Sequence, residues 1–578
     1  MVTRWSTPVS AIVGLLASPW PREPAVDKEL VEACGYLDCP EATDLVAASE
    51  AIGSGVAAFG TLVAVVIGSL PLLPLVLALG VALPYATRVS PPLAAEIVRT
   101  RAVADAPALF GRVTIRLRVE PSPERAAAFA GRSGDGDLAD SLAEHARRAR
   151  GTPDSGLGAF ATEWTEQAPA VERAAALIAD AADAPADARD RGCERAVSAV
   201  RSGVEERAAA FAGEVRAPLT GLYAFGVLLP LALVGVLPAA RLAGVNVGAD
   251  TLTVLYCLVL PVTLLAASAW LLAQRPVSFP PPRIDSDHPD VPDRRQGAIL
   301  LGVLGAVATG AVLLSLRPWA APVAAVGVGT GTALLWLFAP ARELRRKIRE
   351  TESGLPDALT LVGRRVADGT AVERALSEAA DELPGETGDR LADAADRGEC
   401  LGLTVEESFF GRFGALGDHP SSRTRDAGRL FALAASEGAP AGDALVAAGD
   451  HLRELRRVER EARRELAAIT GTLSNTAALF GPLVGGVSVA MVGRIPADAG
   501  GATSTLGGGP STAAALGPPS LGPIVGVYVL LLAVILTGLA TALERGIDRS
   551  LLAYRIGLAL PTATAAYVAA VVAAGAVL

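Results

Sequence analysis

Lysine is almost absent from this chain of 578 residues. Only Lys28 and Lys347 are lysines among 51 basic residues, so nearly all the positive charge is arginine. A phosphate loop of the Gly-x-x-x-x-Gly-Lys-Ser/Thr type needs a lysine that reaches the phosphates, and neither lysine lies in such a loop. The sequence therefore indicates a protein that is not an enzyme of this nucleotide-hydrolysing kind, and we expect neither catalytic residues nor a cofactor.

Charged residues are also missing from the interiors of eight long apolar blocks. Each block is long enough to cross a hydrocarbon core of about 30 Å, for which a helix needs about 20 residues. With 51% apolar residues and a positive mean hydropathy, the chain is expected to be an all-α polytopic membrane protein. Ion-coupled transporters keep ionisable side chains at membrane depth, which argues against that class. The blocks are 51–86, 219–240, 251–273, 297–316, 320–339, 467–493, 521–543 and 556–578.

The first apolar block, 51–86, is longer than one crossing requires. Pro71 and Pro74 interrupt its middle, and a proline inside a helix removes a backbone hydrogen bond and bends or ends the helix. We therefore predict a hairpin of two short spans, which gives about nine spans in all. One long tilted span is the alternative, and it would change only the side on which the N-terminus lies.

The distribution of arginine between the loops predicts the orientation. Segments 88–216 and 341–466 and the connectors 274–296 and 544–555 all carry arginine, and placing them inside satisfies the positive-inside tendency. The loop 495–520, in contrast, is rich in Gly, Ala, Ser, Thr and Pro and has no basic residue. We expect a multi-pass protein of the cell membrane with its N-terminus in the cytoplasm and its C-terminus outside.

Histidine and cysteine are scarce, and their positions limit the possible chemistry. All four histidines lie in polar segments, so Ser488 has no histidine at membrane depth to activate it as a protease nucleophile. Cys34 and Cys39 are the only close cysteine pair, and without a nearby histidine they do not predict a metal site. The small residues of the apolar blocks instead predict close helix packing. Examples are Gly486 and the rows Gly302, Gly305, Gly310 and Gly327, Gly329, Gly331.

The chain contains an internal duplication. Pro107 and Arg116 recur as Pro356 and Arg365, 249 positions later, and Phe225-Gly226 recurs as Phe480-Gly481 at an offset of 255. Each copy is a charged segment with helical periodicity that runs directly into an apolar block. The predicted domains are an N-terminal cytoplasmic helical segment (1–50), a membrane hairpin (51–87), a first cytoplasmic bundle (88–216), four membrane helices (217–340), a second cytoplasmic bundle (341–466) and three membrane helices (467–578).

The second charged segment has the pattern of two amphipathic helical hairpins. A helix is predicted to begin at Leu355, with Pro356 in its first turn, where the missing N–H costs nothing. Apolar residues recur at helical spacing on both sides of Gly369, which we expect to form the first turn. The second turn is predicted at Gly438-Ala439-Pro440.

An arginine-rich helix is predicted at the end of this segment, from His451 to Leu466. Its arginines alternate with glutamates at spacings of three and four, which supports ion pairs within the helix, and it continues into the membrane at Ala467. Two interpretations remain open: a self-paired face near the lipid headgroups, or a docking surface for a partner. The arginines are Arg453, Arg456, Arg457, Arg460, Arg463 and Arg464.

The second copy resembles the type II secretion F domain. The resemblance depends on a Leu-Pro-x-x-Leu helix start, a glycine turn followed by Glu-Arg-Ala-Leu, and a later Gly-Ala-Pro turn. In the first copy Glu120-Pro121-Ser122-Pro123 replaces the glycine turn, and 131–158 is expected to be loose and polar. The motif residues are Leu355, Pro356, Leu359, Gly369, Glu373, Ala375, Leu376 and Gly438.

Two such domains in tandem resemble the archaeal platform proteins of type IV pili and archaella, called PilC, TadC or FlaJ. The acidic surface with arginine in place of lysine is similar to that of haloarchaeal proteins. The resemblance implies a non-enzymatic platform in the lipid bilayer beneath which a hexameric secretion ATPase docks, and which lifts pilin or archaellin subunits into a filament. It allows a homodimer and implies no nucleic acid. The alternatives are a polytopic transporter or permease and a scaffold for other exported proteins.

Overall fold

The structure, a computed structural model, is helical throughout the residues that it describes. The chain divides into two compact units, residues 1–103 with 273–277 and residues 104–272 with 278–578, and we describe each by itself. The described residues are 26–37, 39–67, 73–134, 136–152, 155–166, 168–242, 248–273, 292, 294–417, 419–492 and 518–577.

The first unit contains α2 (Lys28–Tyr36), α3 (Ala42–Ile67) and α4 (Leu73–Ala104). Helices α3 and α4 are antiparallel neighbours, because Gly53 lies against Gly80 and Arg88 forms an ion pair of 2.7 Å with Glu50. A Cβ atom on Gly53 would lie 2.4 Å from the carbonyl oxygen of Gly80. The first apolar block is thus divided between two helices, as the hairpin interpretation requires, while Pro71 lies outside the described residues.

Seven helices of the described residues are long and apolar enough to cross a membrane. They cover all or most of each of the seven predicted blocks that follow the first one, whereas α3 and α4 are not among them, so the predicted number of nine is not reached. Most of the connectors 274–296 and 495–520 lies outside the described residues. The seven helices are Ala186–Val236, Ala249–Leu272, Arg295–Leu316, Pro318–Ala367, Ala441–Val492, Pro518–Arg545 and Arg549–Ala576.

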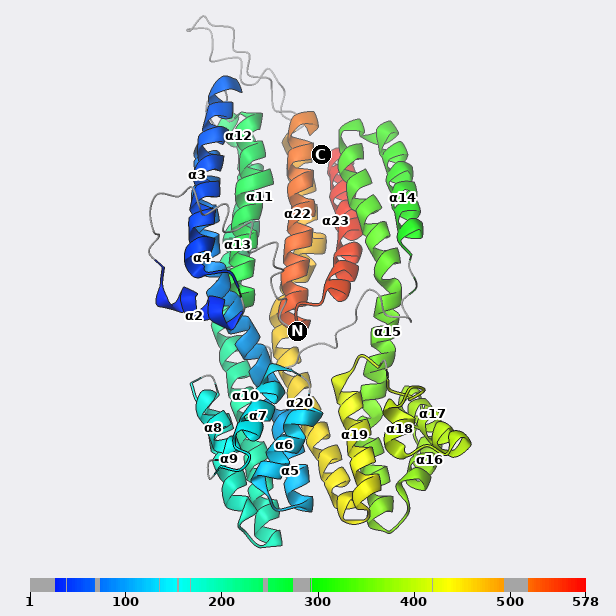
Figure 1. Cartoon of the computed structure of the whole chain (residues 1–578). Coiled ribbons are helices and arrows are strands. Elements are labelled where there is room, and N and C mark those ends of the chain that lie inside the picture. Colours follow the sequence, from blue (N-terminus) through cyan, green and yellow to red (C-terminus); the bar gives the residue numbers. More distant parts are fainter. Residues whose placement is uncertain are drawn as a thin grey trace, which may run out of the picture. The chain divides into compact units, whose positions relative to one another are not determined.

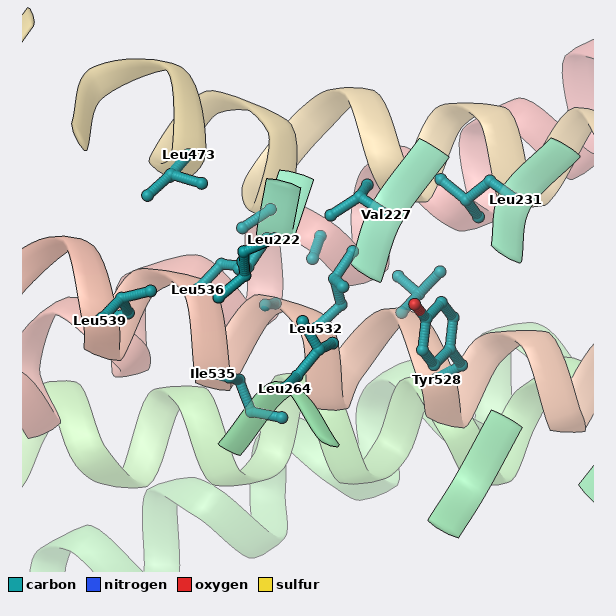
Figure 2. Packing of buried hydrophobic residues seen from close by; sticks show 14 of the residues in the cluster. Leu222, Val227, Leu231, Leu264, Leu473, Tyr528, Leu532, Ile535, Leu536 and Leu539 are labelled. Carbon is teal, nitrogen blue, oxygen red and sulfur yellow. The ribbon is translucent and has the colours of Figure 1, made fainter. Parts of the chain in front are cut away.

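Helix α22 (Pro518–Arg545) is the most buried of these seven helices. Its side chains pack against the helices of both sequence copies, and Figure 2 shows Leu532 and Leu536 facing Leu222 and Val227 of the first copy. The neighbouring apolar elements form a common core with it. They are η2 (Ala224–Leu228), α11 (Leu229–Leu242), α12 (Ala249–Val254), η3 (Leu255–Val259), α13 (Leu260–Ala273), η5 (Thr476–Phe480), α21 (Gly481–Val492) and α23 (Arg549–Val577).

Glycines allow the close helix packing that the sequence predicts. Gly302 of α14 (Arg295–Leu316) and Gly329 of α15 (Ala321–Ala367) face each other, and a Cβ on Gly329 would lie 2.9 Å from the Gly302 carbonyl oxygen. On another face of α15, Gly331 packs against Pro561 of α23. Gly486, next to the buried Ser488, packs against α23 as well. The packing interpretation of these small residues is confirmed.

Three π-helical turns interrupt the apolar helices at η2, η3 and η5. A π turn displaces backbone carbonyls from the regular ladder, and in an apolar setting such groups need another donor. The hydroxyl of Tyr528 donates to the Gly226 carbonyl within η2, and that of Tyr256 donates to the Pro230 carbonyl at 2.6 Å. The two rings meet edge to face, with centroids 5.2 Å apart. Tyrosines from α22 and η3 therefore hold the widened turn in place.

The duplication extends to the helix boundaries. Helix α6 spans 123–133, and adding 249 to these bounds gives the bounds of α16, 372–382. The same offset relates the first residue of α7, 137, to that of α17, 386, and the first residue of α8, 156, to that of α18, 405. Adding 255 to the last residue of α9, 182, gives that of α19, 437. The first bundle consists of α5 (Ala106–Val119), α6 (Pro123–Ser133), α7 (Asp137–Arg148), α8 (Gly156–Glu163), α9 (Pro169–Ala182) and α10 (Ala186–Tyr223). The second bundle consists of the end of α15 with α16 (Val372–Glu382), α17 (Glu386–Leu401), α18 (Val405–Phe410), α19 (Ser422–Glu437) and α20 (Pro440–Asn475).

The expectation that 131–158 is loose and polar is wrong. Helix α7 occupies the middle of this segment and buries Leu138, Leu142 and Ala146. The apolar residues recur every three to four positions among charged ones, so the segment is an ordinary amphipathic helix. Its apolar stripe is narrow and most of its residues are polar, which made the segment resemble a loop in the sequence.

The prediction that Pro356 lies in the first turn of a helix is also wrong. It lies in the interior of α15, which is continuous over 47 residues. Proline removes one backbone hydrogen bond and pushes the preceding turn outward, which leaves carbonyls free to accept from side chains. The carbonyl of Thr351 accepts from the Thr387 hydroxyl at 2.8 Å, and that of Ser353 accepts from Arg456 Nη1 at 2.7 Å.

All four boundaries predicted between a charged segment and an apolar block lie inside continuous helices. Residues 87 and 88 are in α4, 216 and 217 in α10, 340 and 341 in α15, and 466 and 467 in α20. Figure 1 shows α15 as one ribbon that leads from the apolar helices into the second bundle. No loop separates the charged parts from the apolar parts at these four places.

The turn at Gly369 needs glycine, as the sequence predicts, because its φ angle is +92°. We expect Gly369→Ala to destabilise the chain by about 1–3 kcal/mol, since a Cβ atom is strained in this conformation. Gly398 in α17 is the matched control, because it has helical geometry and room for a Cβ. Gly398→Ala should be neutral or stabilising. Unfolding of both full-length variants in detergent tests this, and equal stabilities would contradict it.

Candidate docking site on the arginine-rich helix

Helix α20 places its arginines between the second bundle and the apolar helices. Gly438, with a φ of +73°, makes the turn before it, and Pro440 opens its first turn. Leu445 and Ala448 enter the core of the bundle, and Gly442 packs closely against Gly363 of α15. The predicted helix 451–466 is part of α20, which begins at Pro440, and its predicted continuation past Ala467 is confirmed.

Arg453 and Arg456 on this helix are bound to α15. Arg453 forms ion pairs with Asp357 at 3.2 Å and with Asp450 of its own helix at 2.5 Å. Arg456 donates to the Ser353 carbonyl in the turn that precedes Pro356. These two guanidinium groups therefore hold α20 against α15, and Arg456 does so at the turn before Pro356.

Glu459 is the centre of a buried ionic network. Its side chain is 7% exposed and accepts hydrogen bonds from Arg423 of α19 at 3.1 Å and from Arg463 at 2.5 Å. Arg423 also lies 3.9 Å from Glu352 of α15, which accepts from the Ser421 hydroxyl at 2.6 Å. A buried carboxylate needs such partners to offset its lost hydration. The network joins α15, α19 and α20 just before the apolar part of α20.

The other three arginines point outward. The side chain of Arg457 is 72% exposed and has only Glu454, 4.0 Å away, as an acidic neighbour. Arg460 donates to the Arg456 carbonyl of its own helix. In the described part of the chain, neither Arg460 nor Arg464 has a carboxylate within 4 Å. The structure thus divides the six predicted arginines, because Arg453, Arg456 and Arg463 bind within the protein and Arg457, Arg460 and Arg464 are free to bind a partner.

Most motif residues of the second copy are buried in the bundle or form its turns. Leu359 and Ala375 are fully buried, and Gly369 and Gly438 form turns with positive φ. Glu373 is the exception, since it is exposed in the first turn of α16, where a carboxylate interacts favourably with the helix dipole. Leu355, Pro356 and Leu376 complete the core.

Contacts between the two bundles were not predicted from the sequence. Arg112 of α5, which is 7% exposed, forms an ion pair of 2.6 Å with Asp426 of α19. Arg116 pairs with Glu437 of α19, also at 2.6 Å. Its counterpart in the duplication, Arg365, instead pairs with acids of its own bundle. Asp426 lies 314 positions from Arg112, and Glu437 lies 321 positions from Arg116, so no local pattern indicates these two pairs.

His451 of α20 is part of this contact between the bundles. Its Nε2 lies 3.3 Å from the Pro107 carbonyl oxygen, and its ring packs against Gly111 of α5. Burial lowers the pKa of His451 to about 4, an effect that the Pro107 carbonyl opposes and the charge of Arg201 increases. The imidazole is therefore neutral at pH 7 and donates to the carbonyl, which makes it a packing residue.

In the described residues, no group of three His, Cys, Asp or Glu side chains is arranged to hold a metal ion. Comparison with known proteins finds no matching family model, no matching curated protein and no matching solved structure.

The network around Glu459 predicts a stability difference between two glutamates of α20. Glu459→Gln should destabilise the protein by about 3 kcal/mol, because it leaves Arg423 and Arg463 without the carboxylate between them. Glu461 is exposed on the same helix, so Glu461→Gln should change stability by about 0.5 kcal/mol or less. Denaturant unfolding of the full chain in detergent measures both. A Glu459→Gln variant as stable as the parent would contradict the prediction.

Proposed function

We propose that this chain is the membrane platform of a type IV pilus-like assembly machine. In this proposal the two bundles are F domains in the cytoplasm, and they couple a hexameric ATPase to the extraction of pilin subunits and to filament assembly. The observation that supports it most is the continuity of three helices, α10, α15 and α20, between charged bundles and apolar segments. A protein that transmits force without its own nucleotide site needs such stiff connections.

The path of force in this proposal follows α20. A push on the second bundle moves α20, which continues through η5 into α21 and packs on the central α22. The ion pairs of Arg112 and Arg116 with α19 transfer part of the movement to the first bundle. Both bundles then act on one apolar core, which a rigid-body mechanism requires.

The exposed arginines Arg457, Arg460 and Arg464 are the proposed docking face for the ATPase. Subtracting 255 places them opposite Ser202, Glu205 and Ala209 of the first copy, so only the second copy carries this face. A row of exposed guanidinium groups attracts an acidic partner and accelerates the encounter. The proposal is therefore one ATPase contact for each chain.

Replacing the docking arginines tests this proposal. The triple change Arg457→Gln, Arg460→Gln and Arg464→Gln should abolish filaments and reduce copurification with the ATPase by about tenfold or more, because several charge-assisted contacts are lost together. The structural arginines of the Glu459 network stay intact, so membrane levels should not change.

The control for the triple variant removes the same charge from the first bundle. Arg147 and Arg148 are exposed at the end of α7 and share Glu144, and Arg150 follows them. Changing these three to Gln should leave filament numbers normal. Normal filaments in the docking variant at parental membrane levels would refute the docking face, and equal losses in both variants would indicate a nonspecific charge effect.

We also propose that nine helices span the membrane, with α3 and α4 as a hairpin and both bundles inside. Cys400 on α17 is exposed and free, so it is a natural reporter in a variant whose other four cysteines are serine. An impermeant maleimide should label Cys400 only after lysis. Gly508→Cys should be labelled in intact cells. Labelling of Cys400 in intact cells would overturn this orientation.

A further inference from the structure

Arginines from three helices gather where the apolar segments of the second unit end. Arg345 of α15 pairs with Asp548, three residues after the end of α22, and Arg423 lies between Glu352 of α15 and Glu459 of α20. Arg342 and Arg349 come from α15, Arg463 from α20, and Arg545 is the last residue of α22. All four lie outside the apolar segments. Burial lowers the pKa of Arg349, the charges of Arg545, Arg463 and Arg342 lower it further, and the charge of Glu352 opposes them.

Two carboxylates next to these four arginines already accept hydrogen bonds from two arginines each. Glu544 accepts from both Arg545 at 3.2 Å and Arg555 at 3.1 Å. Glu459 is divided between Arg423 and Arg463 in the same way. The acids therefore do not neutralise the arginines, and the cluster keeps a positive excess. An anion bound there would offset the repulsion between guanidinium groups.

Arg349 is the member of the cluster with unused donors. Its Nε donates to the Arg345 carbonyl of its own helix at 3.2 Å, and no carboxylate of the described residues lies within 4 Å of it. Arg345 itself is committed, because it forms a buried ion pair with Asp548 in the turn between α22 and α23. Arg342 is held by Tyr554, whose hydroxyl accepts from its Nη1 at 2.6 Å. The terminal nitrogens of Arg349 remain available to an incoming group.

We propose that this cluster, Arg342, Arg349, Arg463 and Arg545, binds the phosphate headgroup of an anionic membrane lipid. Arginine binds phosphate oxygens through paired hydrogen bonds, and basic pockets between membrane helices on the cytoplasmic side bind anionic headgroups. The apolar part of α15 exposes Trp336, and α23, which packs along α15, exposes Leu558, so acyl chains can lie beside these side chains. A free phosphate would use the arginines but not this apolar surface.

The lipid would neutralise the junction at which α15, α20 and α22 meet. This inference rests on the proposed membrane placement of the apolar helices, and it does not depend on the ATPase or on filament assembly. Lipid binding by the purified chain can therefore fail while the docking proposal holds, and the reverse is equally possible.

Binding of phosphatidylglycerol to the purified full-length chain in detergent tests the proposal. Native mass spectrometry across a lipid titration should show saturable binding of phosphatidylglycerol, with phosphatidylcholine binding about tenfold or more weakly. Arg349→Gln should weaken the binding of phosphatidylglycerol about tenfold, because it removes the guanidinium that has no internal partner. Arg349→Lys, which keeps the charge but lacks the planar fork, should have an intermediate effect.

Arg346→Gln is the matched control, because Arg346 is exposed on the same helix and already pairs with Glu343 and Glu350. It should leave lipid affinity unchanged within about twofold. If Arg349→Gln does not fold, Arg349→Lys serves as the test, and a weaker affinity for phosphatidylglycerol supports the proposal. Equal affinities for the two lipids would overturn the proposal, and so would unchanged binding in the Arg349 variants. Displacement of the lipid by inorganic phosphate or glycerol phosphate at equal concentration would overturn it too, because the site would then prefer a free anion.

Discussion

The continuity of backbone hydrogen bonds across the ends of the apolar segments is the constraint on which the rest of the structure depends. In an α-helix each N–H binds the carbonyl four residues earlier, so α10, α15 and α20 cannot move in a bundle without moving their apolar continuations. Pro218 and Pro340 lie close to these boundaries and permit a fixed bend without a loop. The ion pairs between the bundles can couple their movements because they join helices that are already rigid.

The duplicated bundles keep the same helices and use their charges differently. Arg116 and Arg365 occupy equivalent positions, yet Arg116 reaches α19 of the other bundle while Arg365 binds within its own. Duplication supplies two copies of a surface, and packing the copies against each other makes the two environments unequal. The second copy keeps its exposed arginines, and the first contributes its α5 to the contact. A division of roles between the copies follows from this asymmetry and needs no difference in fold.

The sequence predicts those features that depend on near neighbours along the chain. Seven apolar blocks are helices, and the turn at Gly369 has the positive φ that glycine allows, because length, hydropathy and backbone freedom are local properties. The place of Pro356 could not be predicted, since its tolerance inside α15 depends on Arg456, which is 100 positions away. Helix α7 was missed because its apolar stripe is narrow. The arginine-rich segment was correctly predicted to be a helix, but the sequence could not show which of its arginines bind within the protein.

The arginine stripe of α20 shows why that distinction needs the tertiary structure. At about 100° per residue, Arg456 and Arg463 lie roughly 60° and 80° to one side of Arg453, and Arg460 lies roughly 20° to the same side. Arg457 and Arg464 lie roughly 40° and 20° to the other side. The sequence defines this stripe completely, but all its members are the same residue type. Helices α15 and α19 cover one edge, where Ser353 and Glu459 bind the guanidinium groups, and leave the other edge open. The function of each arginine is therefore set by what lies across from it, and a single helix can anchor a bundle with one edge and present charge to a partner with the other.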